Sequence, residues 1–316
     1  MWLTEFGGPE VLVAGDAPDP VAGPRQALVE VAFANVTFVE TQVRAGGFAP
    51  YKVKPPVIPG NGIGGVVRAV GADADRRLVG RRVIASTGGS GGYAELAAVD
   101  AVALLRVPEG MELDSAVALL ADGRTATMLV RAAGLREGER VLVEAAAGGV
   151  GTLLVQLARA AGARVVAAAG SPRKLEVARE LGADVVVDYE EPDWADRVRA
   201  EVGRLDVVFD GVGGAVGRAA FELLGRGGRM LSYGLASGEW AGISDEAAAR
   251  RGVTLLRPKA SPGELRAFTV HALAEAAAGR LRPLIGQRFP LERAADAHAA
   301  LQRRATVGKT LLAVDR

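Results

Sequence analysis

The sequence contains no cysteine and only two histidines, His271 and His298. Without cysteine the chain can form neither a disulfide nor a thiolate metal site. Both histidines fall in segments with a helical pattern, away from the glycine-rich loops, so we interpret them as ordinary helix residues. The sequence therefore predicts no metal site, and with it no route that activates an alcohol or ketone through zinc.

Net charge is also nearly absent, because 38 Lys and Arg residues are balanced by 37 Asp and Glu residues. A net charge of +1 provides no long-range field to attract nucleic acid or an anionic membrane surface. The sequence lacks an apolar run of about 18 residues, the length that spans a bilayer, and a basic-then-apolar leader. We therefore expect a cytoplasmic protein that binds neither nucleic acid nor membrane.

The 316 residues are enough for two domains, and the sequence pattern changes along the chain. Residues 1–112 carry short β-type runs broken by glycine and proline, which is typical of a small twisted sheet or barrel; these runs lie at 27–33, 65–70, 82–86 and 93–99. Residues 113–257 instead alternate apolar runs with helical stretches, which predicts a doubly wound parallel sheet; these runs lie at 141–144, 164–168, 184–187, 206–209, 229–233 and 253–256.

The last segment, 258–316, contains a long helix, a strand at 287–289, a helix near 291–303 and a final strand at 309–314. Ser261-Pro262-Gly263-Glu264 indicates a helix start, with a capping serine, proline at the first position and glutamate three residues after the cap. We expect the final strand to rejoin the first region, which would make 113–257 a domain inserted in a domain formed by 1–112 and 258–316.

The most specific motif runs from Val141 to Gly151 and reads VLVEAAAGGVG. It follows a β-run and opens a helix, which is the context that a Rossmann dinucleotide-binding turn requires. Ala145 stands where the motif usually has its first glycine. The backbone could approach a pyrophosphate at Gly148, Gly149 and Val150. Gly151 would let the helix pack close to the strand. The alternative is a glycine-rich turn that binds no ligand.

The next strand ends at Gly170-Ser171, without the acidic residue that bonds the ribose 2′-hydroxyl in NAD sites. Ser171, Arg173 and Lys174 offer a hydroxyl and two cations, which suit the 2′-phosphate of NADPH. Alternatively, Ser171 only caps the helix that begins at Pro172, and the two cations lie on its solvated face. The sequence favours NADPH over NADH.

Glycines and aromatic residues also follow the later predicted strands, where ligands of open α/β sheets bind. Tyr189 follows the third strand and would stack on adenine or bond the phosphate, or it is a half-buried aromatic at a strand end. Gly211 follows the fourth strand, and Tyr233-Gly234-Leu235-Ala236 follow the fifth. These residues are candidate cofactor contacts, and they are also ordinary turn residues.

The chain resembles the zeta-crystallin-type quinone oxidoreductases, which are zinc-free members of the medium-chain dehydrogenase/reductase superfamily. Several segments spread over nearly the whole chain carry the resemblance: 6–12, 35–41 with Arg44 and Gly46, 145–151, 182–184 leading to Asp188-Tyr189, 209–213, and Gly308-Lys309. The resemblance implies a Rossmann domain inserted in a GroES-like catalytic domain, a nicotinamide cleft between the two, and a homodimer.

The resemblance also implies roles for individual residues. Asn35 would lie near the nicotinamide and substrate, and Thr125 would approach the nicotinamide from the start of the helix that links the domains. Gly170, Ser171, Lys174 and Tyr189 would hold the 2′-phosphate end of the adenosine. Arg257 and Lys309 would be further cofactor contacts. Glu40 stands where the family commonly has aspartate, and Asn61 replaces the usual acidic residue after Pro59-Gly60.

Without a metal, the feasible reaction is hydride transfer to an acceptor that is already electrophilic, such as a quinone or a conjugated enone. The Asn35 amide and the Thr125 hydroxyl are candidate donors to the developing oxyanion, although Asn35 can equally be a turn residue and Thr125 a helix-face residue. Glu40 and Tyr51 are candidate proton donors, with solvent as an alternative. Two other functions stay open: an enone or enoyl-thioester reductase, and an NADPH-binding protein with a structural or sensing role.

Overall fold

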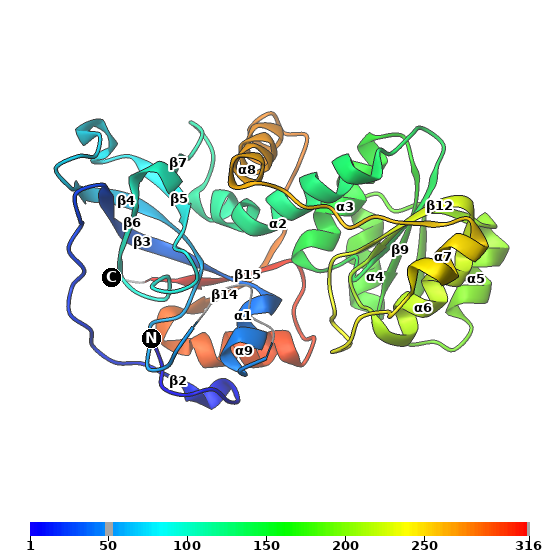
Figure 1. Cartoon of the computed structure of the whole chain (residues 1–316), viewed down its shortest axis with the longest axis horizontal. Coiled ribbons are helices and arrows are strands. Elements are labelled where there is room, and N and C mark those ends of the chain that lie inside the picture. The colour runs from blue at the N-terminus through cyan, green and yellow to red at the C-terminus, as the bar shows by residue number, and fades with distance from the viewer. Residues whose placement is uncertain (48–52, 315–316) are drawn as a thin grey trace. The chain divides into compact units, whose positions relative to one another are not determined.

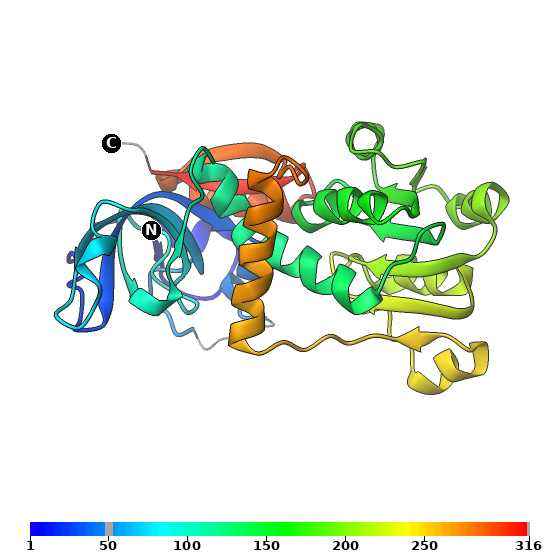
Figure 2. The same ribbon diagram turned by 90° about the horizontal axis from the view of Figure 1, so that it is seen from above.

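The computed structural model describes residues 1–47 and 53–314, which form two compact units. Unit 1 comprises Met1–Ala121 and Leu273–Arg316, and unit 2 comprises Asp122–Ala272. The unit boundaries fall inside two long helices, α2 (Leu113–Ala133) and α8 (Pro262–Ala277), the latter orange in Figure 2. The sequence pattern places the boundaries at 112/113 and 257/258 instead, because helical periodicity does not indicate where the contacts of a helix change from one unit to the other.

Unit 1 is built around a seven-stranded sheet in which the long strand β3 (Gln26–Val36) pairs with β4, β6 and β15. Burial alternates along β3 and places Ala27, Val29 and Val31 in the hydrophobic core. The pairing of β15 with β3 confirms that the final strand rejoins the first region. The other elements of this unit are β1 (Trp2–Leu3), β2 (Leu12–Val13), α1 (Phe38–Arg44), β4 (Gly62–Val70), β5 (Arg82–Ser86), β6 (Leu96–Asp100), β7 (Leu105–Arg106), β14 (Ile285–Pro290), α9 (Ala294–Gln302) and β15 (Lys309–Ala313).

Unit 2 is a six-stranded parallel sheet in the order β10-β9-β8-β11-β12-β13, connected by helices that Figure 1 labels. Apolar residues of the strands and of α5, α6 and α7 form one core that includes Leu142, Val198 and Phe221. This architecture confirms the predicted doubly wound sheet. Its elements are β8 (Arg140–Glu144), α3 (Gly149–Ala160), β9 (Arg164–Ala169), α4 (Pro172–Glu180), β10 (Val185–Asp188), α5 (Trp194–Val202), β11 (Leu205–Asp210), α6 (Gly214–Leu223), β12 (Leu224–Ser232), α7 (Asp245–Arg251) and β13 (Thr254–Leu255).

The strand order of unit 2 has one feature that positions the site. The chain moves from β8 outward through β9 to β10, and then returns to β11 on the other side of β8. The carboxyl ends of β8 and β11 therefore form the topological switch point, where open α/β sheets bind their ligands.

The predicted capping box at the start of α8 is confirmed. The Glu264 carboxylate accepts hydrogen bonds from the Ser261 backbone N–H at 2.8 Å and from its hydroxyl at 2.7 Å. These bonds lower the pKa of Glu264. The short helix start was predictable because every contact that forms it lies within four residues.

Candidate dinucleotide-binding site

The glycine-rich turn joins β8 to α3 as the sequence predicts. Ala145 has a positive φ of 48°, a conformation that glycine adopts more easily, which explains why the family motif has glycine here. A Cβ added to Gly151 would lie 2.2 Å from the Ala145 carbonyl oxygen. The prediction that Gly151 permits close packing of helix on strand is thereby confirmed.

Gly149 lies against an acidic side chain that the sequence did not indicate. A Cβ at Gly149 would lie 2.0 Å from Oδ2 of Asp122, a residue of α2 that is 8% exposed. Gly148 precedes the helix as its N-cap, and no side chain caps this helix start. On the side that faces Asp122, the turn therefore has room for backbone but not for a side chain. The first N–H groups of α3 are left without a side-chain cap.

At the end of β9 the structure brings together Gly170 and Tyr189, two of the predicted cofactor contacts. A Cβ at Gly170 would lie 2.9 Å from the Tyr189 ring and 3.0 Å from Oε1 of Glu190. Ser171 occupies the N-cap position of α4, but its side chain makes no capping hydrogen bond, so the capping alternative is wrong for its hydroxyl. Arg173 and Lys174 follow in the first turn of this helix. The carboxylate of Glu190 is a neighbour that sequence reasoning missed.

The turns after β11 and β12 contact each other and the first turn. A Cβ at Gly211 would lie 2.6 Å from the Tyr233 hydroxyl oxygen, and a Cβ at Gly234 would lie 2.5 Å from the Gly211 carbonyl oxygen. The Tyr233 hydroxyl donates to the carbonyl of Glu144, at the end of β8, over 3.2 Å. The Ala236 N–H donates to the Gly211 carbonyl at 3.4 Å, and Leu235 lies in the same turn. Three glycine-bearing turns are thus joined at one end of the sheet.

Three of the predicted site residues that the structure describes lie in unit 1. Asn35 is part of β3 rather than a turn and is 2% exposed; its Oδ1 has no hydrogen-bond partner among the described residues. Lys309 is 3% exposed and close enough to Glu40 to oppose the upward shift of the pKa of its carboxyl. Burial nevertheless raises the pKa of Glu40 above its usual value. Tyr51 lies outside the described residues.

Glu40 has a structural role that its position in the chain explains. Its carboxylate accepts from the Thr37 N–H at 2.6 Å and from the Asn61 N–H at 2.8 Å, and the Tyr93 hydroxyl lies 3.4 Å away. The first of these bonds belongs to the capping box of α1. The Tyr93 hydroxyl also meets Nε2 of His298 at 2.9 Å. Sequence reasoning missed this buried chain of side chains because its members lie far apart in the sequence.

His298 is therefore a buried, hydrogen-bonded histidine rather than an ordinary helix residue. It is 1% exposed, and burial together with the Arg44 guanidinium lowers its pKa to about 3. The neutral imidazole contacts Tyr93 edge-on, with ring centroids 5.7 Å apart. Within residues 1–47 and 53–314, no group of three or more His, Asp or Glu side chains is placed to hold a metal ion.

Thr125 is placed differently from the expectation, and Arg257 makes an ion pair that the sequence did not indicate. Thr125 lies in the middle of α2 and not at its start, because the helix already begins at Leu113. Arg257 forms an ion pair with Asp245 at 2.7 Å and lines an apolar cavity of about 320 Å³ beside Trp240. Neither position could be read from the sequence, since one depends on helix length and the other on a long-range ion pair.

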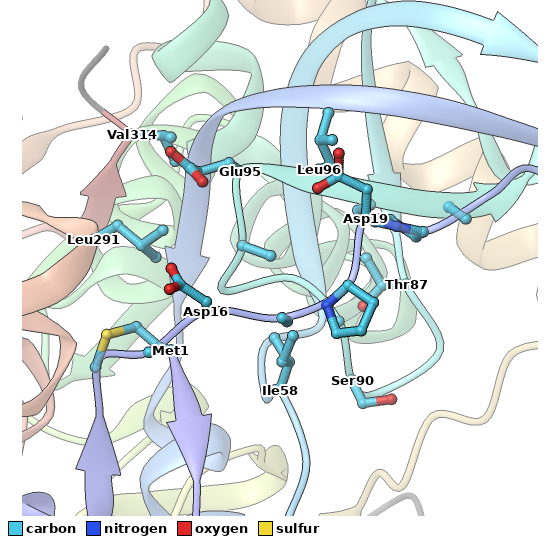
Figure 3. A pocket seen from close by; sticks show the side chains of 18 of the residues that line it. Met1, Asp16, Asp19, Ile58, Thr87, Ser90, Glu95, Leu96, Leu291 and Val314 are labelled. Atoms are coloured by element: carbon cyan, nitrogen blue, oxygen red, sulfur yellow. The ribbon is translucent and has the colours of Figure 1, made fainter.

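A cavity of about 630 Å³ lies in unit 1, and none of the predicted site residues lines it (Figure 3). Asp16, Asp19 and Glu95 are among its lining residues. This cavity is therefore separate from the predicted dinucleotide site. None of the described helices has the length and hydropathy that crossing a membrane requires.

Comparison with known proteins is consistent with this geometry. Residues 23–109 match the alcohol dehydrogenase GroES-like domain family, and residues 149–257 match the zinc-binding dehydrogenase family. A quinone oxidoreductase of Pseudomonas aeruginosa is 34% identical over 97% of both chains. Among solved structures, the Escherichia coli quinone oxidoreductase complexed with NADPH has a TM-score of 0.91 and 28% identity, covering 99% of this chain and 98% of the other.

Another solved structure, described as an NAD-dependent alcohol dehydrogenase, has a TM-score of 0.90 and 31% identity, with 99% of each chain covered. The fold is thus shared by a protein described as NAD-dependent and a protein solved with NADPH. The family is decided by the 34% sequence identity to a quinone oxidoreductase over nearly the full length. The chain belongs to the quinone oxidoreductases of the medium-chain dehydrogenase/reductase superfamily, with a GroES-like unit and a Rossmann unit.

Proposed function

We propose that this protein is an NADPH-dependent oxidoreductase that transfers hydride to quinones or related conjugated carbonyls without a metal. One observation carries the proposal: three turns after β8, β11 and β12 converge, and at Gly151, Gly211 and Gly234 an added Cβ would lie within 2.6 Å of another atom. The bare backbone of such turns suits a dinucleotide at a topological switch point. When bound, NADPH would supply the hydride from its nicotinamide ring.

The choice of NADPH rests on the end of β9. Gly170 and Ser171 stand where NAD sites have a carboxylate, and Ser171 keeps its hydroxyl out of a capping bond. We propose that this hydroxyl, Arg173 and Lys174 hold the 2′-phosphate, with Tyr189 against the adenosine. The Glu190 carboxylate beside Gly170 weakens this preference, because it would repel a phosphate.

The residues of the chain do not fit a zinc site of the cysteine and histidine type. The sequence has no cysteine, His298 is buried against Tyr93, and His271 is in a different helix, α8. We therefore propose an acceptor that is electrophilic without a Lewis acid. The Asn35 amide and the Thr125 hydroxyl are the proposed donors to its oxygen. Glu40 is the proposed proton source, since burial favours the protonated acid.

An NADPH oxidation assay with 9,10-phenanthrenequinone and a panel of enones tests the proposal. We expect turnover of the quinone, and activity should survive exhaustive chelation. Reduction of enones or enoyl thioesters alone would establish the alternative reductase. Binding of NADPH without turnover of any acceptor would establish a structural or sensing role instead.

We also propose a homodimer in the cytoplasm. In the sheet of unit 2, strand β13 pairs only with β12 among the described strands, and Trp240 nearby is 47% exposed. An unpaired strand edge with an exposed aromatic side chain suits association with a second copy. Light scattering should give twice the chain mass of 32.5 kDa, and a monomer at micromolar concentration would contradict the dimer. Cell fractionation tests the location.

A further inference from the structure

Two carboxyl side chains meet at the carboxyl ends of the central strands of unit 2. Glu144 is the last residue of β8 and Asp210 the last residue of β11, and both are 0% exposed. Their strands are neighbours in the sheet. The pair therefore lies at the switch point, below the turns that the proposed function assigns to the cofactor.

Asp210 holds the turn that follows it. Its Oδ1 accepts from the Val212 N–H at 3.2 Å and from the Gly213 N–H at 2.7 Å. Its Oδ2 accepts from the Ser232 hydroxyl at 2.7 Å, which connects β11 to the end of β12. Three donors on one carboxyl group are the pattern of an ionised acceptor.

Glu144 completes this arrangement from the neighbouring strand. Its Oε2 also accepts from the Val212 N–H, at 3.2 Å, so the two carboxyl groups share one donor, and its Oε1 has no hydrogen-bond partner among the described residues. Two buried carboxyl groups that converge on one N–H avoid a contact between like charges when one of them carries a proton. The Glu144 backbone carbonyl in addition accepts from the Tyr233 hydroxyl, and the Tyr233 N–H donates to the Asp210 carbonyl at 2.9 Å.

The surroundings place the proton on Glu144. Among the described residues neither carboxyl takes part in an ion pair, so no cation offsets a second negative charge. Burial first, and then the charge of Asp210, raise the pKa of Glu144 well above its usual value. The other titratable groups around Tyr233 are Tyr189 and Asp122, and neither adds a positive charge.

We propose that Glu144 and Asp210 are positioning residues that share one proton and thereby fix the 211–213 turn beside the 145–151 turn, in the geometry that the dinucleotide needs. Loss of that proton would put two like charges in contact inside the protein and release the turn. The affinity for NADPH should then fall at alkaline pH. This inference rests on the proposed function for its ligand, but the turn itself can be followed without ligand.

The substitution Glu144→Gln tests the inference, because glutamine matches protonated glutamate in shape and donates to Asp210 at every pH. Asp210→Ala removes the acceptor of the Gly213 N–H and one of the two acceptors of the Val212 N–H. Asp206→Ala is the matched control, because Asp206 lies at the other end of the same strand and bonds Arg140 at 2.9 Å. Circular dichroism and thermal unfolding establish that each variant is folded.

At pH 7, we expect the dissociation constant for NADPH to stay within about threefold for Glu144→Gln and Asp206→Ala, and to rise at least about tenfold for Asp210→Ala. As the pH is raised from 7 to 10, the wild type should lose affinity and Glu144→Gln should not. Titration of lysines changes the NADPH affinity of the wild type and of Glu144→Gln alike, so it cancels when the two pH profiles are compared. If the pair shared no proton, the wild type and Glu144→Gln would show the same dependence of NADPH affinity on pH.

Hydrogen exchange of the Val212 and Gly213 amides in the ligand-free protein provides the second readout. Asp210→Ala should accelerate their exchange about tenfold relative to Asp206→Ala, while Glu144→Gln keeps the protection. Should Asp210→Ala not fold, Ser232→Ala, which removes one donor to Asp210, should give about a threefold effect on both readouts. Equal exchange and affinity in the Asp210 or Ser232 variant and the control would overturn the inference. Amide protection that behaves as expected without NADPH binding would overturn the proposed function alone.

Discussion

The two units of this protein each bury a glutamate beside predicted site residues, and the two glutamates are held in different ways. Glu40 in unit 1 bonds two backbone N–H groups and lies near Lys309. Glu144 in unit 2 has another acid, Asp210, as its partner. Unit 1 thus holds its glutamate by backbone hydrogen bonds, whereas unit 2 holds its glutamate against a second acid at the start of two short turns.

The largest effect should come from removing the acid of unit 1. Glu40→Ala leaves the buried Thr37 and Asn61 N–H groups without their acceptor, which should lower the free energy of unfolding by about 3 kcal/mol or more. Urea unfolding measures this loss. Glu40→Gln, which keeps one acceptor oxygen but not the charge, should lose less, and a loss below about 1 kcal/mol in Glu40→Ala would contradict a stabilising role of these bonds.

In unit 2, changes in the 145–151 turn should affect stability and NADPH binding more than the loss of any charge. Gly151→Ala would place its Cβ 2.2 Å from the Ala145 carbonyl, and should cost about 1–3 kcal/mol of stability while weakening NADPH strongly. Calorimetry and urea unfolding report the two effects. Gly263→Ala is the control, since no atom lies within 4 Å of its added Cβ. If Gly151→Ala bound NADPH with the affinity of the wild type, the turn would not be part of the cofactor site.

The pH dependence of stability should also separate the two acids. The pKa of Glu144 is raised in the folded protein, so its favourable contribution is complete below the unfolded value of 4.5 and is lost as the pH rises toward the folded value. Within that window the loss is about 1.4 kcal/mol per pH unit. The stability of Glu144→Gln relative to wild type should therefore increase from pH 5 to pH 8 in urea titrations. A constant difference would contradict the shared proton.

Two lysines sharpen the comparison further. Lys174, half-buried in the first turn of α4, should act on the ligand, and Lys174→Ala should weaken NADPH about tenfold with little effect on NADH. Lys309 is buried and should act on stability instead. Arg179→Ala, at the other end of α4, serves as the control for binding. Equal weakening of both dinucleotides by Lys174→Ala would show that Lys174 is only a surface residue.

The smallest effect concerns Ala145. Its positive φ costs an L-residue about 1–2 kcal/mol, and glycine would avoid this cost. Part of the advantage of glycine is lost, because its unfolded chain has greater conformational freedom. Ala145→Gly should therefore stabilise the protein by less than about 1 kcal/mol. A destabilised variant in urea unfolding would show that the Ala145 methyl group has a packing role that outweighs its strain.

The sequence predicted those parts of the fold and site that depend on neighbouring residues. The 145–151 turn, the Ser261–Glu264 capping box and the parallel strands are all recognisable within a few residues. The contacts that it missed join distant segments: Asp122 with Gly149, and Tyr93 with His298. Glu144 and Asp210 did carry a signal, because an acidic residue that ends an apolar strand needs a partner, but pairing them requires the strand order.

The account depends on one interaction, the binding of NADPH by unit 2. Isothermal titration calorimetry of the purified protein with NADPH and with NADH measures it directly. We predict saturable binding of one NADPH per chain and weaker binding of NADH, with the preference reduced by Lys174→Ala. No measurable heat or protection with NADPH under conditions where the protein is folded would contradict the account.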